Sequence, residues 1–373
     1  MNNDIRSLHI NTEPTWRGGE LQTLYLLEGL ARRGFRVFLC AQKGSPLAER
    51  ARAANIETAE VQMRGEIDIF AAAKISRLIK RFDPALVHYH TSHAHTLGAM
   101  ACWLRGYKRP RTLLTRRVDF SIYRHSFLGL NHLKYRAVDH IVTISRAILA
   151  VLLADGLPPD NIDCVPSGVD PKRFSDVKPV DLRSELGLPS DIKLVGNIAF
   201  FADHKGQRYL VEAAPTILER FPNCAIVLIG EGGLRKPLMK LAKQLGVEDR
   251  VLFPGFRNDV PAILRSLDVY AMPSHQEGLG TAILDALCCG VPVVASDAGG
   301  IPEVVHHDVN GLLVPPRRSP ELAEAILRVL TNEEEAARYS AAGPVTIERE
   351  YTVDRMVDGN IEVYRKLVKS PSG

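Results

Sequence analysis

Two acids flank a glycine-rich turn near residue 280, and their spacing suggests chemistry. The turn follows Pro273, and residues 281–287 after it are good helix formers. Gly278 and Gly280 let a ligand approach the backbone, while the free N–H groups of the helix start favour phosphate or hydroxyl oxygens. Glu277 lies just before that helix and Asp285 about one turn inside it. Acids that only offset a helix dipole would not require the glycines, so this pattern favours a ligand with both hydroxyls and phosphates, such as a nucleotide sugar.

A cation with matching chemistry follows the predicted strand 194–198. Lys205 stands beside Gly206 at the start of a predicted helix. A lysine in that position supplies a flexible point charge that can stabilise a departing diphosphate. A solvated surface lysine is the competing interpretation.

These segments together resemble the GT-B glycosyltransferases of family 4, also described as glycosyl transferases group 1. The Glu277 to Asp285 spacing, the run Gly-Val-Pro-Val-Val-Ala-Ser at 290–296 and the run Gly-Gly-Ile-Pro-Glu at 299–303 carry the resemblance, which is to bacterial cell-envelope and lipopolysaccharide sugar transferases. It implies that Glu277 approaches the donor sugar and that Asp285, where the family usually has Glu, holds the ribose hydroxyls. Glu277 and Lys205 are therefore the predicted catalytic residues.

The resemblance also implies a donor-binding set spread over several turns of the chain. Asn197 stands where the family usually has Arg, the loops after residues 229 and 253 lie near the nucleotide, and a Gly-Gly loop after the first strand faces the diphosphate. The predicted donor-binding residues are Gly18, Gly19, Asn197, Lys205, Gly230, Glu231, Phe256, Arg257, Glu277, Gly278, Leu279, Gly280, Thr281 and Asp285.

The acceptor-side candidates come from the first half of the chain. Four histidines at 88, 90, 93 and 95 suggest a metal, but no carboxylate or cysteine is placed to complete a site, with 93 and 95 expected in a loop after the strand 86–90. Hydrogen bonds to an acceptor are the preferred interpretation, and a bidentate arginine would suit an anionic acceptor. The acceptor-side candidates are His90, His93, Arg116, Arg117 and Asp119; we predict no metal and no cofactor beyond the nucleotide-sugar substrate.

Alternating strands and helices position all of these residues. Residues 5–10 and 36–40 read as strands around a helix over 21–33, and the predicted helix 68–81 leads to a strand over 86–90. The pattern restarts at 193–198 after a proline-bearing stretch over 171–179. Further strands are predicted at 111–115, 141–145, 225–229, 251–253, 269–272, 291–295 and 311–314.

The predicted fold class is α/β, with two Rossmann-like, doubly wound parallel-sheet domains that face each other across a cleft, the GT-B architecture. Residues 1–175 form the predicted acceptor-side domain and 176–345 the nucleotide-sugar-binding domain. Residues 346–373 include an amphipathic helix that the family precedent packs back on the N-terminal domain.

Composition restricts the class of protein. The chain has 373 residues, 46% hydrophobic and 24% charged, which is typical of two globular domains. No apolar run reaches the ~18 residues of a membrane helix, and the first residues lack the features of a signal peptide. We therefore predict a cytoplasmic protein. The six cysteines have no metal-ligand or disulfide spacing and are expected to be reduced.

Positive charge is concentrated in one segment. Residues 101–150 contain ten Lys or Arg and two Asp, so this stretch carries +8 while the whole chain carries +4. Aromatic residues are interleaved with the charges, which suits an anionic membrane surface or acceptor. The prediction is peripheral contact with the inner face of the cytoplasmic membrane through the basic residues of 105–146. A merely solvated face is the alternative, and no nucleic-acid motif accompanies the charge.

The sequence thus predicts a retaining, metal-independent transfer of a sugar from a nucleotide donor to a hydroxyl of a cell-envelope glycan or a lipid-linked acceptor such as lipopolysaccharide. Retention is implied by the resemblance alone. An epimerase or hydrolase acting on nucleotide sugars is an alternative, and would form product without an acceptor. A noncatalytic nucleotide-sugar-binding protein is another, and would bind the donor without turnover.

Overall fold

The computed structural model describes residues 5–106, 109–123 and 130–369. The chain divides into two compact units. Unit 1 contains residues 1–168 and 353–373, and unit 2 contains residues 169–352. Both boundaries lie seven residues from the predicted ones at 175 and 345. The two parallel sheets with flanking helices confirm the predicted α/β fold of GT-B type.

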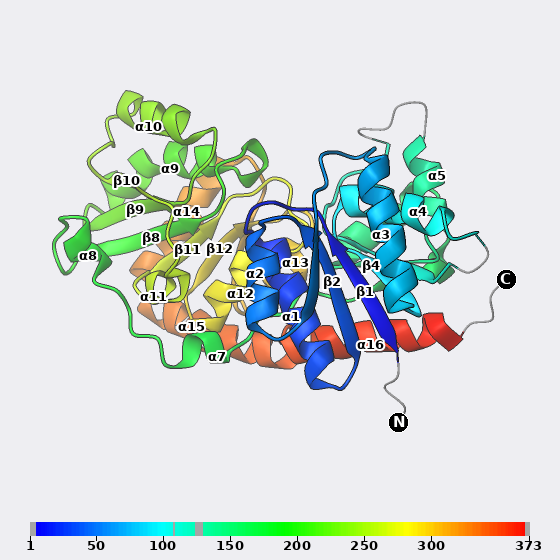
Figure 1. Cartoon of the computed structure of the whole chain (residues 1–373). Helices are drawn as coiled ribbons and strands as arrows, with labels where there is room; N and C mark the ends of the chain where they lie inside the picture. Colours follow the sequence, from blue (N-terminus) through cyan, green and yellow to red (C-terminus); the bar gives the residue numbers. More distant parts are fainter. Residues whose placement is uncertain (1–4, 107–108, 124–129, 370–373) are drawn as a thin grey trace. The chain divides into compact units, whose positions relative to one another are not determined.

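Unit 1 is built on a seven-stranded parallel sheet in the order β3-β2-β1-β4-β5-β6-β7 (Figure 1). The strands are short and largely buried because helices cover both faces. Strand order reverses between β1 and β4, which are hydrogen-bonded neighbours. The strands are β1 (Arg6–Asn11), β2 (Arg36–Gln42), β3 (Glu57–Val61), β4 (Leu86–Tyr89), β5 (Arg111–Arg116), β6 (His140–Thr143) and β7 (Ile162–Cys164).

Two hydrophobic cores lie in unit 1. One contains residues of α1, α2 and α16, and the other contains residues of α3, α4 and α6. Figure 1 shows α3 and α4 side by side, and α16 running past α1. The helices are α1 (Gly18–Arg32), α2 (Pro46–Ala53), α3 (Ile69–Phe82), α4 (Ser92–Trp103), α5 (Leu130–Arg136), α6 (Arg146–Ala154) and α16 (Val353–Lys369), with a short 3₁₀ helix η3 (Pro159–Asn161).

Unit 2 is built on a six-stranded parallel sheet in the order β10-β9-β8-β11-β12-β13. Its strand order reverses between β8 and β11, which are also hydrogen-bonded neighbours. The strands are β8 (Lys193–Ile198), β9 (Cys224–Ile229), β10 (Val251–Gly255), β11 (Val269–Met272), β12 (Val293–Ser296) and β13 (Gly311–Val314).

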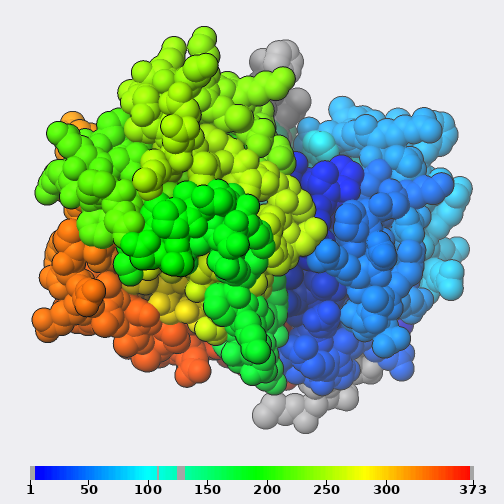
Figure 2. All heavy atoms as spheres, turned by 90° about the vertical axis from the view of Figure 1, so that its left-hand side faces the viewer, coloured from blue at the N-terminus to red at the C-terminus, as the bar shows by residue number. Residues whose placement is uncertain are grey.

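The helices of unit 2 bring distant segments together. A core under α9, α10 and α14 covers one side of the sheet, and α14 packs against α9. Figure 2 shows the orange segments around residue 325 beside green segments of the same unit. An ion pair between Arg220 of α9 and Glu324 of α14 also links the two helices. The elements are α7 (Lys172–Ser175), α8 (Leu182–Glu185), η4 (Asp203–Lys205), α9 (Gln207–Arg220), α10 (Arg235–Gln244), α11 (Val260–Leu264), α12 (Thr281–Cys288), α13 (Ile301–Val304), α14 (Ser319–Thr331) and α15 (Glu333–Glu350).

Three local expectations need correction. Residues 18 and 19 form the first turn of α1 rather than a loop before it, because the helix begins directly after Arg17. Residues 93 and 95 belong to α4 and not to a loop, because Thr91 caps that helix by accepting a bond from the Ala94 N–H. Strands β3 and β7 were not predicted. The first is an edge strand with charged residues, and the second has only three residues.

Membrane crossing has no structural candidate in the described part of the chain. None of its helices combines the length and the hydropathy that a membrane span requires.

The contact between α1 and α16 yields a stability prediction. A Cβ added at Gly29 would lie 2.4 Å from Cγ2 of Val357, so the close approach of the two helices requires glycine. We expect Gly29→Ala to destabilise unit 1 by about 1–3 kcal/mol through overpacking, although alanine favours a helix. Val357→Ala in the same chain should restore most of the loss, because it removes the clash.

The measurement is urea unfolding followed by tryptophan fluorescence. Both tryptophans of the chain, Trp16 and Trp103, lie in unit 1, so the signal reports that unit. Equal stability of Gly29→Ala and the unaltered chain would contradict the tight packing.

Candidate functional site

The first group of predicted site residues lies in unit 2, where the strand order reverses. The loop after β8 carries Lys205 and the loop after β11 carries Glu277. Their side chains are 20% and 13% exposed, and Lys205 Nζ donates to Glu277 Oε2 over 2.6 Å. Ligands of doubly wound sheets bind beyond the carboxyl ends of the strands at this reversal. The structure thus brings the two predicted catalytic residues into direct contact.

Backbone contacts hold the two loops together. Gly206 has a φ of +67°, and a Cβ there would lie 2.0 Å from the Pro273 carbonyl oxygen. The His275 N–H donates to the His204 carbonyl oxygen over 3.0 Å. Only glycine permits both the positive φ and the close approach. The position of Lys205 relative to Glu277 is therefore set by backbone packing as well as by their charges.

A third loop, which follows β12, also contacts the Glu277 loop. The Gly300 N–H donates to the Glu277 carbonyl oxygen over 2.9 Å, and a Cβ on Gly300 would lie 2.2 Å from the Gly278 carbonyl oxygen. The Gly-Gly-Ile-Pro-Glu run at 299–303 therefore acts by packing its backbone on the Glu277 loop.

Asp285 is partly buried near the middle of α12, about one turn from the start of the helix. Burial raises the pKa of its carboxyl group to about 6, although the charge of Arg173 acts in the opposite direction. Burial also raises the pKa of Tyr270 in β11, and the charges of Glu277 and Asp285 add to that effect. The negative charges of both acids therefore favour the neutral form of Tyr270, whose hydroxyl donates to the Ile198 carbonyl oxygen.

Asn197 plays a different local part from the arginine that the resemblance leads one to expect. It is fully buried in β8, and its amide Nδ2 donates to the Ala271 carbonyl oxygen of β11 over 2.8 Å. Its Oδ1 has no hydrogen-bond partner among the described residues. The side chain ties two strands together at the reversal, and its predicted contact with the donor remains a prediction.

The other donor-side candidates differ in their surroundings. Phe256 is 62% exposed, while Arg257 pairs with Glu185 over 2.7 Å and with Asp259 over 2.6 Å. Gly230 has a φ of +140°, and its N–H donates to the carbonyl oxygen of Gly255 at the end of β10. The Glu231 carbonyl oxygen accepts from the Phe201 N–H of the loop after β8. The α12 start contributes buried Gly278, Leu279 and Gly280, the last with a φ of +87° as N-cap, followed by partly buried Thr281.

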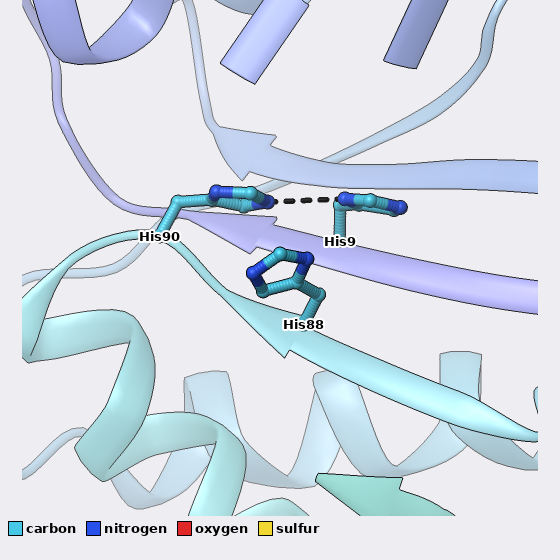
Figure 3. A group of neighbouring side chains, drawn as sticks. All are labelled: His9, His88 and His90. Atoms are coloured by element: carbon cyan, nitrogen blue, oxygen red, sulfur yellow. Dashed lines mark hydrogen bonds between the residues drawn. The ribbon is translucent and has the colours of Figure 1, made fainter. Parts of the chain in front are cut away.

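The second group lies in unit 1, again at the reversal of strand order. His9 from β1 joins His88 and His90 from β4 and its end, and all three are buried (Figure 3). His9 Nδ1 lies 3.0 Å from His90 Nε2, and His9 Nε2 lies 3.0 Å from Ser7 Oγ. His88 contacts Tyr364 Oη of α16 and Thr115 Oγ1 of β5, both over 2.6 Å. His90 Nδ1 is buried without a partner among the described residues.

These histidines are neutral at pH 7. Burial lowers the pKa of His9 to about 3. Burial, followed by the neighbouring histidines and Arg117, also lowers the pKa values of His88 and His90. Charging His88 or His90 would bury a cation that is also repelled by the Arg117 guanidinium.

Their nitrogens lie within 4.8 Å of one another, so the cluster is the candidate metal group of the described residues. However, both nitrogens of His88 are already hydrogen-bonded, and the positive charge of Arg117 acts on the cluster. A divalent cation would be buried here without a carboxylate ligand and near a second cation. The geometry fits a hydrogen-bonded network better than a metal centre.

Three acceptor-side candidates share one cavity. His90, Arg116 and Arg117 line a cavity of about 330 Å³ within unit 1. The guanidinium of Arg116 already donates to Tyr135 Oη and to the carbonyl oxygens of residues 118 and 120. Arg117 is therefore the stronger candidate for a ligand anion, because its Nε is buried without a partner among the described residues. His93, exposed on α4, and Asp119 do not line this cavity.

Sequence reasoning missed Asn11 and Glu20, which form a hydrogen-bonded pair near Arg117. Glu20, in the first turn of α1, is 5% exposed and accepts from Asn11 Nδ2 at the end of β1 over 3.3 Å. Burial lowers the pKa of Arg117 to about 10, and the charge of Glu20 opposes that effect. A Cβ on Gly19 would lie 3.6 Å from Arg117 Cδ. Polar residues at a strand's end and a helix start were the available signal. Gly18 begins the same helix.

Several of the basic residues in 105–146 are engaged within unit 1. Arg109 and Arg111 pair with Asp139, and Lys134 pairs with Glu66 over 3.3 Å. Tyr107, Lys108, Arg124 and Phe127 lie outside the described residues. The segment therefore presents less free positive charge than its composition suggests.

Comparison with known proteins matches each of the two units to a family. The family described as Glycosyltransferase Family 4 matches residues 16–173, and that described as Glycosyl transferases group 1 matches residues 181–345. The structure of HepE from Anabaena in complex with UDP and glucose superposes with a TM-score of 0.85 at 23% identity, over 97% of this chain and all of that one. This likeness concerns the fold.

Curated relatives align over part of their length. An uncharacterized glycosyltransferase of Methanocaldococcus jannaschii is 30% identical over 232 residues, which are 60% of this chain and 59% of that protein. A GDP-mannose-dependent phosphatidylinositol monomannoside mannosyltransferase of Mycobacterium tuberculosis is 33% identical over 210 residues, 53% of this chain and 54% of that protein. The chain thus spans a little over half the length of these relatives.

The buried histidines predict an acid-labile unit 1. An unfolded histidine binds a proton below its ordinary pKa of 6.5, whereas folded His9 does so only near pH 3. Its contribution to stability is therefore complete above pH 6.5 and is lost as pH falls toward 3, with a slope of up to about 1.4 kcal/mol per pH unit. His9→Asn should reduce the slope of the free energy of unfolding against pH between pH 7 and 5. The free energy is measured by urea unfolding followed by tryptophan fluorescence.

His93→Asn is the matched control, since His93 is exposed and should leave that slope unchanged. An unchanged slope in His9→Asn would show that this histidine is not held neutral.

Proposed function

Because this chain belongs to the family 4, group 1 glycosyltransferases, we propose that it transfers a sugar from a nucleotide-sugar donor to an acceptor hydroxyl. The observation that carries the proposal is the contact between Lys205 and Glu277 at the strand reversal of unit 2. The proposed acceptor is a cell-envelope glycan or a lipid-linked molecule such as lipopolysaccharide.

The proposed chemistry is electrostatic. The diphosphate of the donor binds beside Lys205 and the amides at the start of α12, and these stabilise the negative charge that grows as the nucleotide leaves. Glu277 turns from its partner lysine to the hydroxyls of the donor sugar and orients the ring. Asp285 accepts hydrogen bonds from the ribose hydroxyls. The residues that perform these steps need no metal.

The acceptor is proposed to bind in the cavity of unit 1. An unpartnered buried polar atom costs about 1–3 kcal/mol, and both His90 Nδ1 and Arg117 Nε are in that state. A ligand with a hydroxyl and an anionic group would satisfy both. The relative that acts on a phosphatidylinositol monomannoside gives precedent for an acceptor of this chemistry.

Retention of the anomeric configuration is proposed from the family resemblance. Without a dedicated nucleophile among the proposed residues, the bond from the anomeric carbon to the diphosphate oxygen would break and the acceptor hydroxyl would attack that carbon on the same face. The departing phosphate would take the acceptor proton. Product analysis by NMR of the new glycosidic bond tests this point.

Donor binding is tested by thermal shift with UDP-glucose, GDP-mannose and an ADP-sugar. We expect one nucleotide class to stabilise the chain, because a bound ligand shifts the unfolding equilibrium by mass action. No shift with any of them at millimolar concentration would contradict the proposed donor. Release of free sugar or formation of an epimer without an acceptor would instead support the hydrolase or epimerase alternative.

The role of Glu277 predicts the outcome of one substitution. Glu277→Gln keeps the shape of the side chain but removes its charge, and we expect transfer to fall by about 100-fold or more while the melting temperature changes little. Transfer is measured by mass spectrometry, with the stabilising donor and a panel of alkyl glycosides and inositol phosphates as acceptors.

Glu324→Gln is the control, because Glu324 also forms an ion pair in unit 2 but lies on α14. Near-normal transfer by Glu277→Gln would refute the assigned site.

The pKa of Asp285 predicts how donor affinity depends on pH. The charged carboxylate is the form that accepts hydrogen bonds from two ribose hydroxyls. Because the pKa of Asp285 is about 6, roughly a tenth of the molecules carry the charged form at pH 5. Affinity for the nucleoside diphosphate should therefore fall by about tenfold from pH 8 to pH 5, as measured by calorimetry.

Asp285→Asn should bind more weakly at pH 8 and lack this pH step. A 2′,3′-dideoxynucleoside diphosphate should also lack it in the unaltered protein. A pH step that persists in Asp285→Asn would assign the titration to another group.

A further inference from the structure

Helix α3 of unit 1 presents a basic stripe on its outward side. Its buried residues Ala71, Ala72, Ile75 and Ile79 face the core. The exposed residues Phe70, Lys74, Arg77 and Arg81 follow at spacings of four, three and four, which places them along one line on the opposite side. Lys80 is exposed beside this line.

The charges of this stripe are free. Among the described residues, none forms an ion pair or a side-chain hydrogen bond with Lys74, Arg77, Lys80 or Arg81. No acid occurs within α3 itself. The flanking acids are engaged elsewhere, because Asp68 caps the helix through the Ala71 N–H and Asp83 pairs with Arg6 over 2.7 Å. The helix therefore carries four uncompensated positive charges on one exposed surface.

Large apolar side chains stand at the start of the same helix. Ile67, Ile69 and Phe70 are 81%, 65% and 85% exposed. Lys134 of α5 reaches Glu66 of this segment, and the neighbouring Leu133 is 65% exposed. Single exposed apolar residues are ordinary on protein surfaces, but several together mark an interaction site. The combination differs from the basic segment 105–146, in which Arg109, Arg111 and Lys134 form ion pairs.

We propose that this surface, made of Ile67, Ile69, Phe70 and the basic stripe of α3, docks unit 1 on an anionic lipid bilayer. Each basic side chain near an anionic membrane gains electrostatic attraction, and isoleucine and phenylalanine can enter the boundary between head groups and acyl chains. The geometry assigns to α3 the membrane contact that composition alone assigned to residues 105–146.

A bilayer fits this surface better than the other polyanions. Nucleic acid would match the charges but not three exposed aliphatic or aromatic side chains clustered at one end of the helix. An acidic protein would require a complementary groove for those side chains, whereas a fluid lipid surface accepts them in any arrangement. The bilayer interpretation uses both features of the surface at once.

The role of this docking rests on the proposed function, because it assumes a lipid-linked acceptor. Docking by α3 would hold unit 1 at the surface where such an acceptor is found. Vesicle binding is measured without donor or acceptor, however, so failure of docking and failure of sugar transfer are separate results.

The test is co-sedimentation of the full chain with vesicles of phosphatidylcholine alone and of phosphatidylcholine mixed with phosphatidylglycerol. We expect binding to the mixed vesicles only, and weaker binding as salt is raised. The triple variant Lys74→Gln, Arg77→Gln, Arg81→Gln should lower the affinity by roughly 100-fold, since each basic residue contributes about fivefold. The double variant Ile67→Ser, Phe70→Ser should lose affinity with its charges intact.

Helix α10 of unit 2 supplies the matched control. Its exposed Lys236, Lys240 and Lys243 have the same spacings of four and three but lack a comparable apolar group at the helix start. Lys236→Gln, Lys240→Gln, Lys243→Gln should keep vesicle affinity. All variants are first compared by their melting temperature, and Lys-to-Gln or Ile-to-Ser changes at exposed positions should leave it unchanged.

Three results would overturn the proposal. Equal loss in the α3 and α10 triple variants would indicate nonspecific charge attraction. Full affinity in the Ile67→Ser, Phe70→Ser variant would remove the apolar part of the surface. Tighter binding to a DNA duplex than to mixed vesicles at the same salt would assign α3 to a nucleic-acid partner.

Discussion

The reversal of strand order in each parallel sheet is the constraint on which the site geometry depends. Successive crossovers leave the sheet toward opposite directions at β1 and β4 in unit 1, and at β8 and β11 in unit 2. The residues that follow those strands therefore gather at the carboxyl edge of each sheet, where doubly wound folds bind their ligands. His90 and Arg117 lie at one such edge, and Lys205 and Glu277 lie at the other. Neither group is contiguous in sequence.

The two edges stabilise their polar groups by different physical means. In unit 2 a lysine and a glutamate neutralise each other, and glycines at 206 and 300 let neighbouring loops pack closely around them. In unit 1 burial keeps three imidazoles neutral. The His9–His90 bond, with bonds to Ser7, Thr115 and Tyr364, engages all of their nitrogens except His90 Nδ1. The charged pair in unit 2 suits a charged ligand. The neutral histidine network in unit 1, with one unpartnered nitrogen, suits a hydroxyl. The network also connects α16, through Tyr364, to the centre of the first sheet.

Much of the fold was predictable because local signals agreed with tertiary structure. The strands at 193–198, 269–272 and 311–314 were predicted with their observed bounds, since buried parallel strands are short apolar runs between turns. Prediction failed where the local sequence signal was weak or fitted more than one secondary structure. Edge strand β3 carries charged residues, β7 is very short, and His93 and His95 gave no indication that Thr91 begins a helix before them. Charge composition describes only a whole segment: within 105–146, Arg109, Arg111 and Lys134 form ion pairs, whereas the stripe on α3 has none among the described residues. The membrane contact of 105–146 stays a prediction.

The sequence by itself determined the family, the two α/β halves, and the residue types at the donor-side turn, because glycines and acids at fixed spacing are local properties of the chain. Only the tertiary structure decided which side chains meet. It joined Lys205 to Glu277 across 72 residues, brought His9 to His90 across 81, and turned Asn197 inward to β11. These contacts follow from strand order and crossover direction, which depend on how whole elements pack, so no local pattern could specify them.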